Sequence, residues 1–217
     1  MGLLIDSAII SEVEEASKFG WVSGITTNPT LLAKSALPPE ETLVKLASLI
    51  KGQIFYQLIS QDKDSMLKEA KIAHELLGDQ LVLKIPANEE GFKAVSALNQ
   101  KIPCAVTALF SPAQALTAIE AGAQYVIIYY NRSLRLMQDG KSFISKTVQI
   151  VKDANKELLA ASLKDLDEII SAKLFGIDHL TIPYALIKKM PDDENGISKQ
   201  AIDEFNRKGT GISLIQK

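Results

Sequence analysis

The sequence predicts a single α/β domain, a (β/α)8 (TIM) barrel with an additional C-terminal helix. Short apolar segments alternate with amphipathic segments along the whole chain, and there are about eight such pairs. The apolar segments lack a strict alternation of apolar and polar residues, which is typical of parallel strands covered on both faces. An open doubly wound sheet is the alternative, because periodicity does not reveal whether a barrel closes.

The expected strands are short, and several are rich in β-branched or aromatic residues. In chain order they are Leu3–Ile5, Val22–Ile25, Ile54–Leu58, Leu81–Ile85, Cys104–Leu109, Tyr125–Tyr129, Leu158–Ala161 and Leu180–Ile182.

The segments between them have the apolar stripes and end signals of helices. The clearest stripes are Met66, Ala70, Ala73 and Leu77, then Leu43, Leu46, Ala47 and Ile50, and then Leu166, Ile169 and Ile170. Ser111 and Pro112 form an N-cap and a first helical residue, and Gly122 supplies a left-handed stop. A last helix is expected near Ser198–Arg207, after a polar loop.

Residues 1–217 are expected to form one domain, because no linker or low-complexity tract interrupts the chain. Hydrophobic residues make up 47% of it and the formal net charge is −2, which gives no support for nucleic-acid binding. Its one cysteine excludes an internal disulfide, and no apolar stretch approaches the ~20 residues that span a bilayer. We therefore expect a cytoplasmic protein with no membrane or nucleic-acid partner.

Polar residues stand at the end of nearly every expected strand. In a closed barrel the carboxyl ends of the strands meet at one mouth, where function gathers. In chain order these residues are Asp6, Thr26, Thr27, Asn28, Gln57, Lys84, Thr107, Tyr129, Asn131, Arg132, Ser162 and Thr181.

Lys84 is the sharpest of these signals, because it is the only charge in the apolar strand Leu81–Pro86. Burial disfavours an ammonium group and lowers its pKa, and a neutral amine is a nucleophile toward a carbonyl carbon. The structural alternative is a lysine that extends to solvent or pairs with a carboxylate.

Asp6 follows the first strand and is a candidate acid/base or a partner for Lys84. Its alternative is an N-cap for a helix that starts near Ala8. The turn Thr26–Thr30 has side chains suited to sugar hydroxyls, or it is an ordinary polar loop.

Gln57, Thr107 and Tyr129 form a candidate group for orienting a water, and otherwise they are satisfied polar residues at strand ends. Arg132 and Ser162 are candidate phosphate ligands with Lys164 in support, because Ser162 is expected just before a helix N-terminus. The alternative for Arg132 is a surface ion pair.

A metal or nucleotide cofactor is not expected. His74 and His179 are expected to be structural, since neither belongs to a cluster with metal-ligand spacing. The chain has no P-loop and no glycine-rich dinucleotide fingerprint.

Taken together, these residues resemble the short transaldolase and fructose-6-phosphate aldolase family. The resemblance runs along nearly the whole chain. Its carriers are Leu4–Asp6, Gly24–Pro29, Leu83–Pro86, Thr107–Phe110, Gly122–Ala123 with Asn131–Arg132, and Ala160–Ser162.

The resemblance implies class I aldolase chemistry in a (β/α)8 barrel, without a cofactor, on sugars or sugar phosphates. It makes Lys84 the Schiff-base lysine and Asp6 the acid/base at the cleaved bond. Thr26 and Asn28 would hold the donor ketose, and Arg132 and Ser162, with Asn131 and Lys164 beside them, would hold phosphate. It also implies a homo-oligomer, a pentamer or decamer, in which residues 196–217 reach a neighbouring subunit.

Two branches of the family differ at the water-holding site. Transaldolases usually have Glu and Phe where this chain has Gln57 and Tyr129, and the aldolase branch has Gln and Tyr. This favours cleavage or formation of fructose 6-phosphate from a dihydroxyacetone unit and glyceraldehyde 3-phosphate. One departure opposes it, because Ile127 stands where the family usually has a small residue, and a bulky side chain there would narrow the donor pocket.

Two other functions remain open on the sequence. One is a transaldolase of the pentose phosphate pathway, which passes the dihydroxyacetone unit between sugar phosphates. The other is a barrel that binds a sugar phosphate without catalysis, against which the set of Lys84, Asp6 and Asn28 argues.

Overall fold

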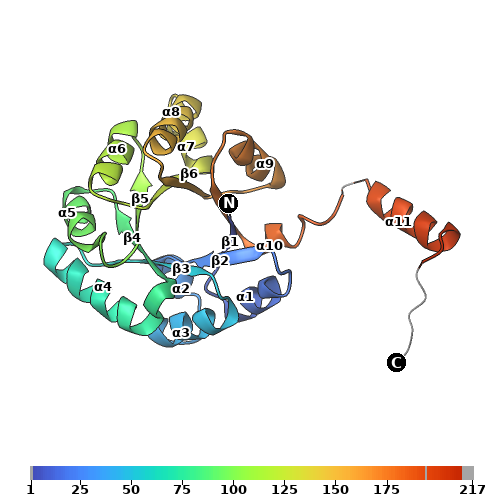
Figure 1. Cartoon of the computed structure of the whole chain (residues 1–217), viewed down its shortest axis with the longest axis horizontal. Coiled ribbons are helices and arrows are strands. Elements are labelled where there is room, and N and C mark those ends of the chain that lie inside the picture. Colours follow the sequence, from blue (N-terminus) through green and yellow to red (C-terminus); the bar gives the residue numbers. More distant parts are fainter. Residues whose placement is uncertain (1, 194, 212–217) are drawn as a thin grey trace. The chain divides into compact units, whose positions relative to one another are not determined.

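The computed structural model describes residues 2–193 and 195–211. Eight parallel strands pair in the order β1-β2-β3-β4-β5-β6-β7-β8, and β8 pairs with β1. The prediction of a closed barrel is therefore confirmed, and Figure 1 shows helices from residues 10–187 arranged around the ring of strands. The strands are β1 (Gly2–Asp6), β2 (Val22–Thr26), β3 (Gln53–Gln57), β4 (Leu81–Pro86), β5 (Cys104–Leu109), β6 (Tyr125–Tyr129), β7 (Glu157–Ala161) and β8 (His179–Ile182).

The helices follow the strands in the predicted alternation. They are α1 (Ile10–Ser17), α2 (Pro29–Leu32), α3 (Pro39–Leu49), α4 (Lys63–Leu77), the 3₁₀ turn η1 (Gly78–Gln80), α5 (Glu89–Leu98), α6 (Pro112–Glu120), α7 (Tyr130–Leu136), α8 (Gly140–Asp153), α9 (Leu166–Leu174), α10 (Tyr184–Ile187) and α11 (Ile197–Lys208).

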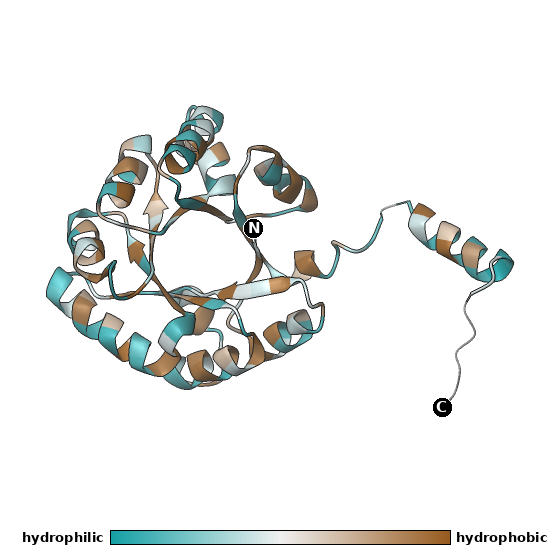
Figure 2. Ribbon diagram, in the orientation of Figure 1, coloured by the Kyte–Doolittle hydropathy of each residue, from teal (hydrophilic) through white to brown (hydrophobic). Residues whose placement is uncertain are grey.

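Several helices have the capping residues and apolar stripes that can be recognised in the sequence. Ser111 caps α6 by accepting a hydrogen bond from the Gln114 backbone, and Pro112 is its first residue, as predicted. The stripe along α4 is buried as predicted, and Figure 2 shows hydrophobic and hydrophilic residues alternating along this helix. The predicted apolar stripe of α9 included Ile170, and this prediction was wrong because the side chain of Ile170 is exposed.

Large side chains fill the barrel interior. This core cluster consists of Leu4, Phe55, Val82, Ala105, Tyr125, Ile127, Leu159 and Ala161, with Tyr129 packed against it. Alternate residues of β6 belong to it, because successive side chains of a strand point to opposite faces. The filled interior leaves the mouth as the place for a site.

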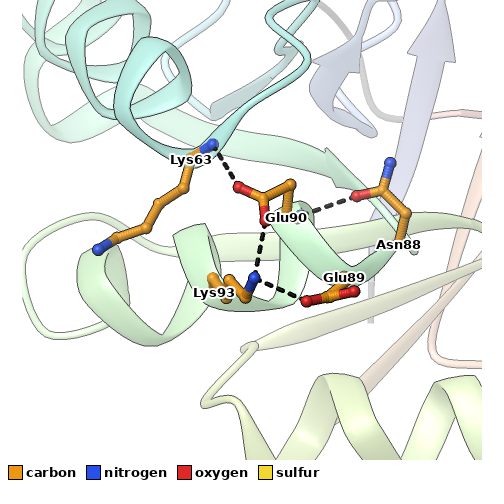
Figure 3. A network of polar contacts seen from close by, with 6 residues as sticks. Lys63, Asn88, Glu89, Glu90 and Lys93 are labelled. Carbon is orange, nitrogen blue, oxygen red and sulfur yellow. Dashed lines mark hydrogen bonds and ion pairs between the residues drawn. The ribbon is translucent and has the colours of Figure 1, made fainter.

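A polar network joins α4 to α5 beside the loops that follow β3 and β4 (Figure 3). Glu90 accepts a hydrogen bond from the backbone N–H of Lys63 at the start of α4, and it forms an ion pair with Lys93. Asn88 caps α5 by accepting a hydrogen bond from the Gly91 backbone. These contacts connect the segment that follows β3, the strand of Gln57, to the segment that follows β4, the strand of Lys84.

The chain divides into a unit that contains the barrel and a second unit that begins at Lys188. In the second unit, Asp193 accepts hydrogen bonds from the backbone of Ile197 and Ser198, which starts α11. The predicted last helix is present. The last part of the predicted tail, residues 212–217, lies outside the described residues, and docking on a neighbour stays a prediction. Within the described part of the chain, no helix has the length and hydropathy needed to cross a membrane.

Candidate active site

A cavity of about 470 Å³ opens at the carboxyl ends of the strands. It is lined by Asp6, Asn28, Pro29, Thr30, Leu31, Gln57, Lys84, Tyr129, Arg132, Ala161, Ser162 and Lys164. Most of the residues that the sequence singled out at strand ends therefore meet in one place.

Lys84 is the buried charge of this cavity. Its side chain is on β4 and the residue is only 5% exposed. Burial lowers the pKa of Lys84 to about 8, against the opposing charge of Asp6. About half of the amine is therefore uncharged near pH 8, where an ordinary lysine is almost fully protonated, and the uncharged amine is the nucleophile.

The amine is held by the backbone that follows β2, which is separated from β4 by β3. Lys84 Nζ donates a hydrogen bond to the carbonyl oxygen of Thr27 at 2.7 Å. Thr27 is itself fixed, since both its backbone N–H and its hydroxyl donate to the carbonyl oxygen of Phe55 at 2.9 Å. The sequence marked Thr27 only as part of a polar turn.

Asp6 lies at the end of β1 and faces the cavity. Burial raises the pKa of its carboxyl group, while Lys84 and a hydrogen bond from Thr26 act in the opposite direction. The alternative role as a helix cap is wrong, because α1 begins at Ile10 and Asp6 makes no capping bond. The Ser7 hydroxyl instead accepts the hydrogen bond of the Ile9 backbone.

Thr26 does not line the cavity and is 1% exposed. Its hydroxyl donates to Asp6 Oδ1 at 2.8 Å and lies 2.5 Å from the hydroxyl of Thr181 on β8. The sequence predicted direct contact with the donor sugar, whereas the structure places Thr26 behind Asp6.

Gln57 and Tyr129 line the cavity, whereas Thr107 does not line it and contacts Tyr129. The Thr107 hydroxyl is buried and donates to the Tyr129 hydroxyl at 3.4 Å, and Phe110 packs edge-on against the Tyr129 ring. Between them Ala108 has a φ of 59°, where the β5–β6 register shifts. This left-handed residue turns the strand end and brings Phe110 to Tyr129.

Arg132, Ser162 and Lys164 line another part of the cavity, where Arg132 and Lys164 supply cationic groups and Ser162 a hydroxyl. The Arg132 guanidinium lies 4.6 Å from the centre of the Tyr129 ring, a cation–π contact. The helix N-terminus expected beside Ser162 is farther along the chain, because α9 begins at Leu166.

Acidic side chains hold the N-terminal end of α9. Asp165 accepts from the Glu168 backbone, and Glu168 accepts from the Lys164 backbone. Asn131 does not line the cavity, because its side chain donates to Glu168 at 2.6 Å.

Asn28 lines the cavity while its Oδ1 caps α2 by accepting from the Leu31 backbone at 2.9 Å. Its amide nitrogen remains the group suited to a sugar hydroxyl. Ile127 is buried in the core cluster and does not line the cavity, so the expected narrowing does not occur at its wall.

The sequence missed several contributors. Leu31 and Ala161 line the cavity but had no assigned role, whereas Thr30 lines it as part of the predicted polar turn. Gln114 joins two site loops, because its side chain accepts from the Phe110 backbone and donates to the Ala87 carbonyl. In the sequence, Gln114 stands three residues after the cap Ser111, a capping-box spacing that gives no hint of the second loop.

Fold and cavity together define a class: a (β/α)8-barrel enzyme with a buried amine of lowered pKa beside a carboxylate at the mouth. Comparison with known proteins narrows this class. The profile of the Transaldolase/Fructose-6-phosphate aldolase family matches residues 3–213. The chain therefore belongs to this family, whose enzymes act on carbon–carbon bonds through a Schiff base.

Relatives that align with nearly the whole chain support the same family assignment. The chain is 35% identical to a probable transaldolase of Hydrogenobaculum sp., over 92% of this chain and 94% of that protein. It is 36% identical to a probable transaldolase of Halalkalibacterium halodurans, with 95% and 100% covered. A third probable transaldolase, from Kosmotoga olearia, is 33% identical, with 98% and 100% covered.

Solved structures support the fold alone. A mandelate oxidase with (S)-2-phenylpropionate superposes with a TM-score of 0.61 at 15% identity, over 92% of this chain and 70% of that chain. Mandelate oxidase with 3,3-difluoro-2-hydroxy-3-phenylpropionic acid gives 0.61 at 14% identity, with 94% and 73% covered.

Proposed function

We propose that this protein is a transaldolase that moves a dihydroxyacetone unit between sugar phosphates through a Schiff base on Lys84. The observation that carries the proposal is the buried Lys84 amine in the cavity beside Asp6, within a chain of this family. The names of the relatives favour transfer over simple cleavage.

The chemistry begins with the uncharged fraction of Lys84. Its amine attacks the ketose C2 carbonyl to give a carbinolamine, which loses water to form a protonated imine. Asp6 then removes the proton from the C4 hydroxyl, and the C3–C4 bond breaks. The bonding electrons move into the iminium to give an enamine on Lys84, and an aldose phosphate leaves.

Transfer runs the same steps backwards on a new acceptor. The enamine carbon attacks the aldehyde of the incoming aldose phosphate, and the protonated Asp6 returns its proton to the new hydroxyl group. Water then hydrolyses the imine and releases the longer or shorter ketose phosphate. In this scheme Arg132, Ser162 and Lys164 bind the phosphate, and Asn28 binds a hydroxyl of the dihydroxyacetone unit.

Fructose-6-phosphate aldolase activity is the second candidate, and Tyr129 favours it. Its hydroxyl lies 3.4 Å from that of Thr107 and is a proton donor that a phenylalanine lacks. Protonation of the enamine followed by hydrolysis would release free dihydroxyacetone.

Two measurements test the proposal. Borohydride reduction with fructose 6-phosphate should add the reduced sugar fragment to the peptide that contains Lys84, and an unmodified peptide would reject Schiff-base chemistry there. Formation of fructose 6-phosphate from free dihydroxyacetone and glyceraldehyde 3-phosphate would support the aldolase. Turnover that requires a ketose-phosphate donor and an aldose-phosphate acceptor would support the transaldolase.

A further inference from the structure

A chain of hydroxyl groups runs behind Asp6, on the side away from the cavity. The Thr26 hydroxyl contacts Asp6 Oδ1 at 2.8 Å, and the Thr181 hydroxyl contacts Thr26 at 2.5 Å. Thr26 and Thr181 are each 1% exposed. The barrel brings them together, because β1 pairs with β2 on one side and with β8 on the other, with Leu4 opposite Thr181.

The direction of these hydrogen bonds follows from counting protons. A threonine hydroxyl has one proton to donate and lone pairs to accept. Within the described residues, Thr26 is the only side-chain hydrogen-bond partner of the Thr181 hydroxyl. If Thr181 donates to Thr26, then the Thr26 proton is free to donate to Asp6, and both protons are used.

The opposite direction leaves a defect. A proton on Asp6 Oδ1 would make Asp6 donate to Thr26 and Thr26 donate to Thr181, and the Thr181 proton would then have no acceptor in the described structure. An unpaired buried donor is unfavourable. The chain therefore keeps the proton off Oδ1, and the hydrogen bond that it donates there is stronger to a carboxylate than to a carboxylic acid. The first hydrogen bond of the chain polarises the second.

On this basis we infer that Thr181 is a positioning residue, which acts through Thr26 to hold Asp6 ionised and oriented for proton removal from the substrate hydroxyl. The inference rests on the proposed function, in which Asp6 is the base of the carbon–carbon cleavage step. Oδ1 is engaged by Thr26, so the second carboxylate oxygen is the one available to substrate.

Other charges face the same carboxylate. Lys84 comes from β4, Lys164 from the loop between β7 and α9, and Lys34 from the segment after α2. All three are cations that favour the ionised form, whereas burial opposes it. Thr181 differs from them because it carries no charge and lies on the side of Asp6 away from the cavity, so replacing it removes no charged group from the cavity.

The test is single-turnover cleavage of fructose 6-phosphate across a range of pH. In T181V the acidic limb of the plot of cleavage rate against pH should move to higher pH by about 0.3–0.5 unit. The reason is that the Thr26 hydroxyl, no longer polarised by Thr181, stabilises the Asp6 carboxylate less well. The cleavage rate at the plateau should fall several-fold. T181S keeps the hydroxyl and should restore both values, and T26V should shift the limb further than T181V.

Thr147→Val is the matched control. Thr147 is another buried threonine, on α8, and its hydroxyl has no hydrogen-bond partner in the described structure. T147V should leave the pH profile unchanged. In a D6N background, T181V should add no further loss, because the two residues act as one unit.

Borohydride trapping with dihydroxyacetone separates this inference from the proposed function. Trapping on Lys84 should persist in T181V, because imine formation does not require the polarised chain. If wild-type protein is not trapped, the proposed function fails. If wild-type protein is trapped and folded T181V keeps the wild-type profile and rate, or T181S fails as T181V does, the role of Thr181 is rejected.

Discussion

Lys84 Nζ donates a hydrogen bond to the carbonyl oxygen of Thr27, at 2.7 Å, across the gap between β4 and the end of β2. The carbonyl is held in place by two hydrogen bonds from Thr27 to Phe55. It accepts a hydrogen bond from the amine whether or not the amine is protonated. The contact therefore fixes the position of the nitrogen without forcing it to carry a charge.

Replacing Lys84 with methionine should abolish turnover and increase stability. The lysine pKa falls from 10.5 to about 8 on folding, so burying the charge costs about 3 kcal/mol at pH 7. The variant leaves the Thr27 carbonyl without its partner, which costs about 1–3 kcal/mol. Urea unfolding should show that the free energy of unfolding is higher in the variant by about 1 kcal/mol.

The pH dependence of that gain has a definite sign. Below pH 8 the wild-type lysine is protonated in both the folded and the unfolded state, so the wild type bears the whole penalty and the gain is largest. Between pH 8 and 10.5 the folded lysine loses its proton first, and the gain shrinks. A gain that grows over this interval would contradict the burial of a charged amine.

Imine formation should rise with pH and level off above about pH 8, since only the uncharged amine attacks a carbonyl. Asp6→Asn should move this rise to lower pH, because the Asp6 charge raises the pKa of Lys84. The measurement is the initial rate of borohydride-trapped adduct with dihydroxyacetone. Asp153→Asn removes one carboxylate from α8 outside the site and should leave the curve in place.

Tyr129→Phe should lower aldolase activity more than transferase activity. Only the aldolase reaction needs a proton delivered to the enamine carbon, and we expect a decrease of about tenfold or more. The ratio of free dihydroxyacetone to transferred product measures it. Tyr130→Phe is the control, because Tyr130 does not line the cavity. An equal loss of both activities would remove the reason to consider the aldolase.

Gln114→Ala should lower kcat about tenfold with little effect on KM, because it releases the loops that carry Ala87 and Phe110. Thermal unfolding should show a loss of about 1–2 kcal/mol for the two hydrogen bonds. Gln114→Glu keeps the acceptor for the Phe110 backbone but loses the donor to Ala87, so it should be intermediate. Gln149→Ala, on α8, should change neither kcat nor KM.

The strands and most helix ends follow from the sequence because their causes are local. Apolar runs of strand length, the cap and proline at Ser111 and Pro112, and the stripe of α4 each depend on neighbours along the chain. The buried position of Lys84 was also predictable, because a lone charge in an apolar strand has few other places to go.

Only the tertiary structure determined which hydrogen-bond partners the polar side chains of the site have. Thr26 was expected to touch substrate, but β8 places Thr181 beside it and Asp6 uses its proton. Asn131 was expected to bind phosphate, but α9 supplies Glu168 as its acceptor. Barrel closure joins residues more than a hundred positions apart, and neither composition nor periodicity encodes which hydroxyl faces which carboxylate. The sequence by itself therefore determined the fold, the lysine and the mouth, and only the folded chain decided which hydrogen bonds the polar groups around them make.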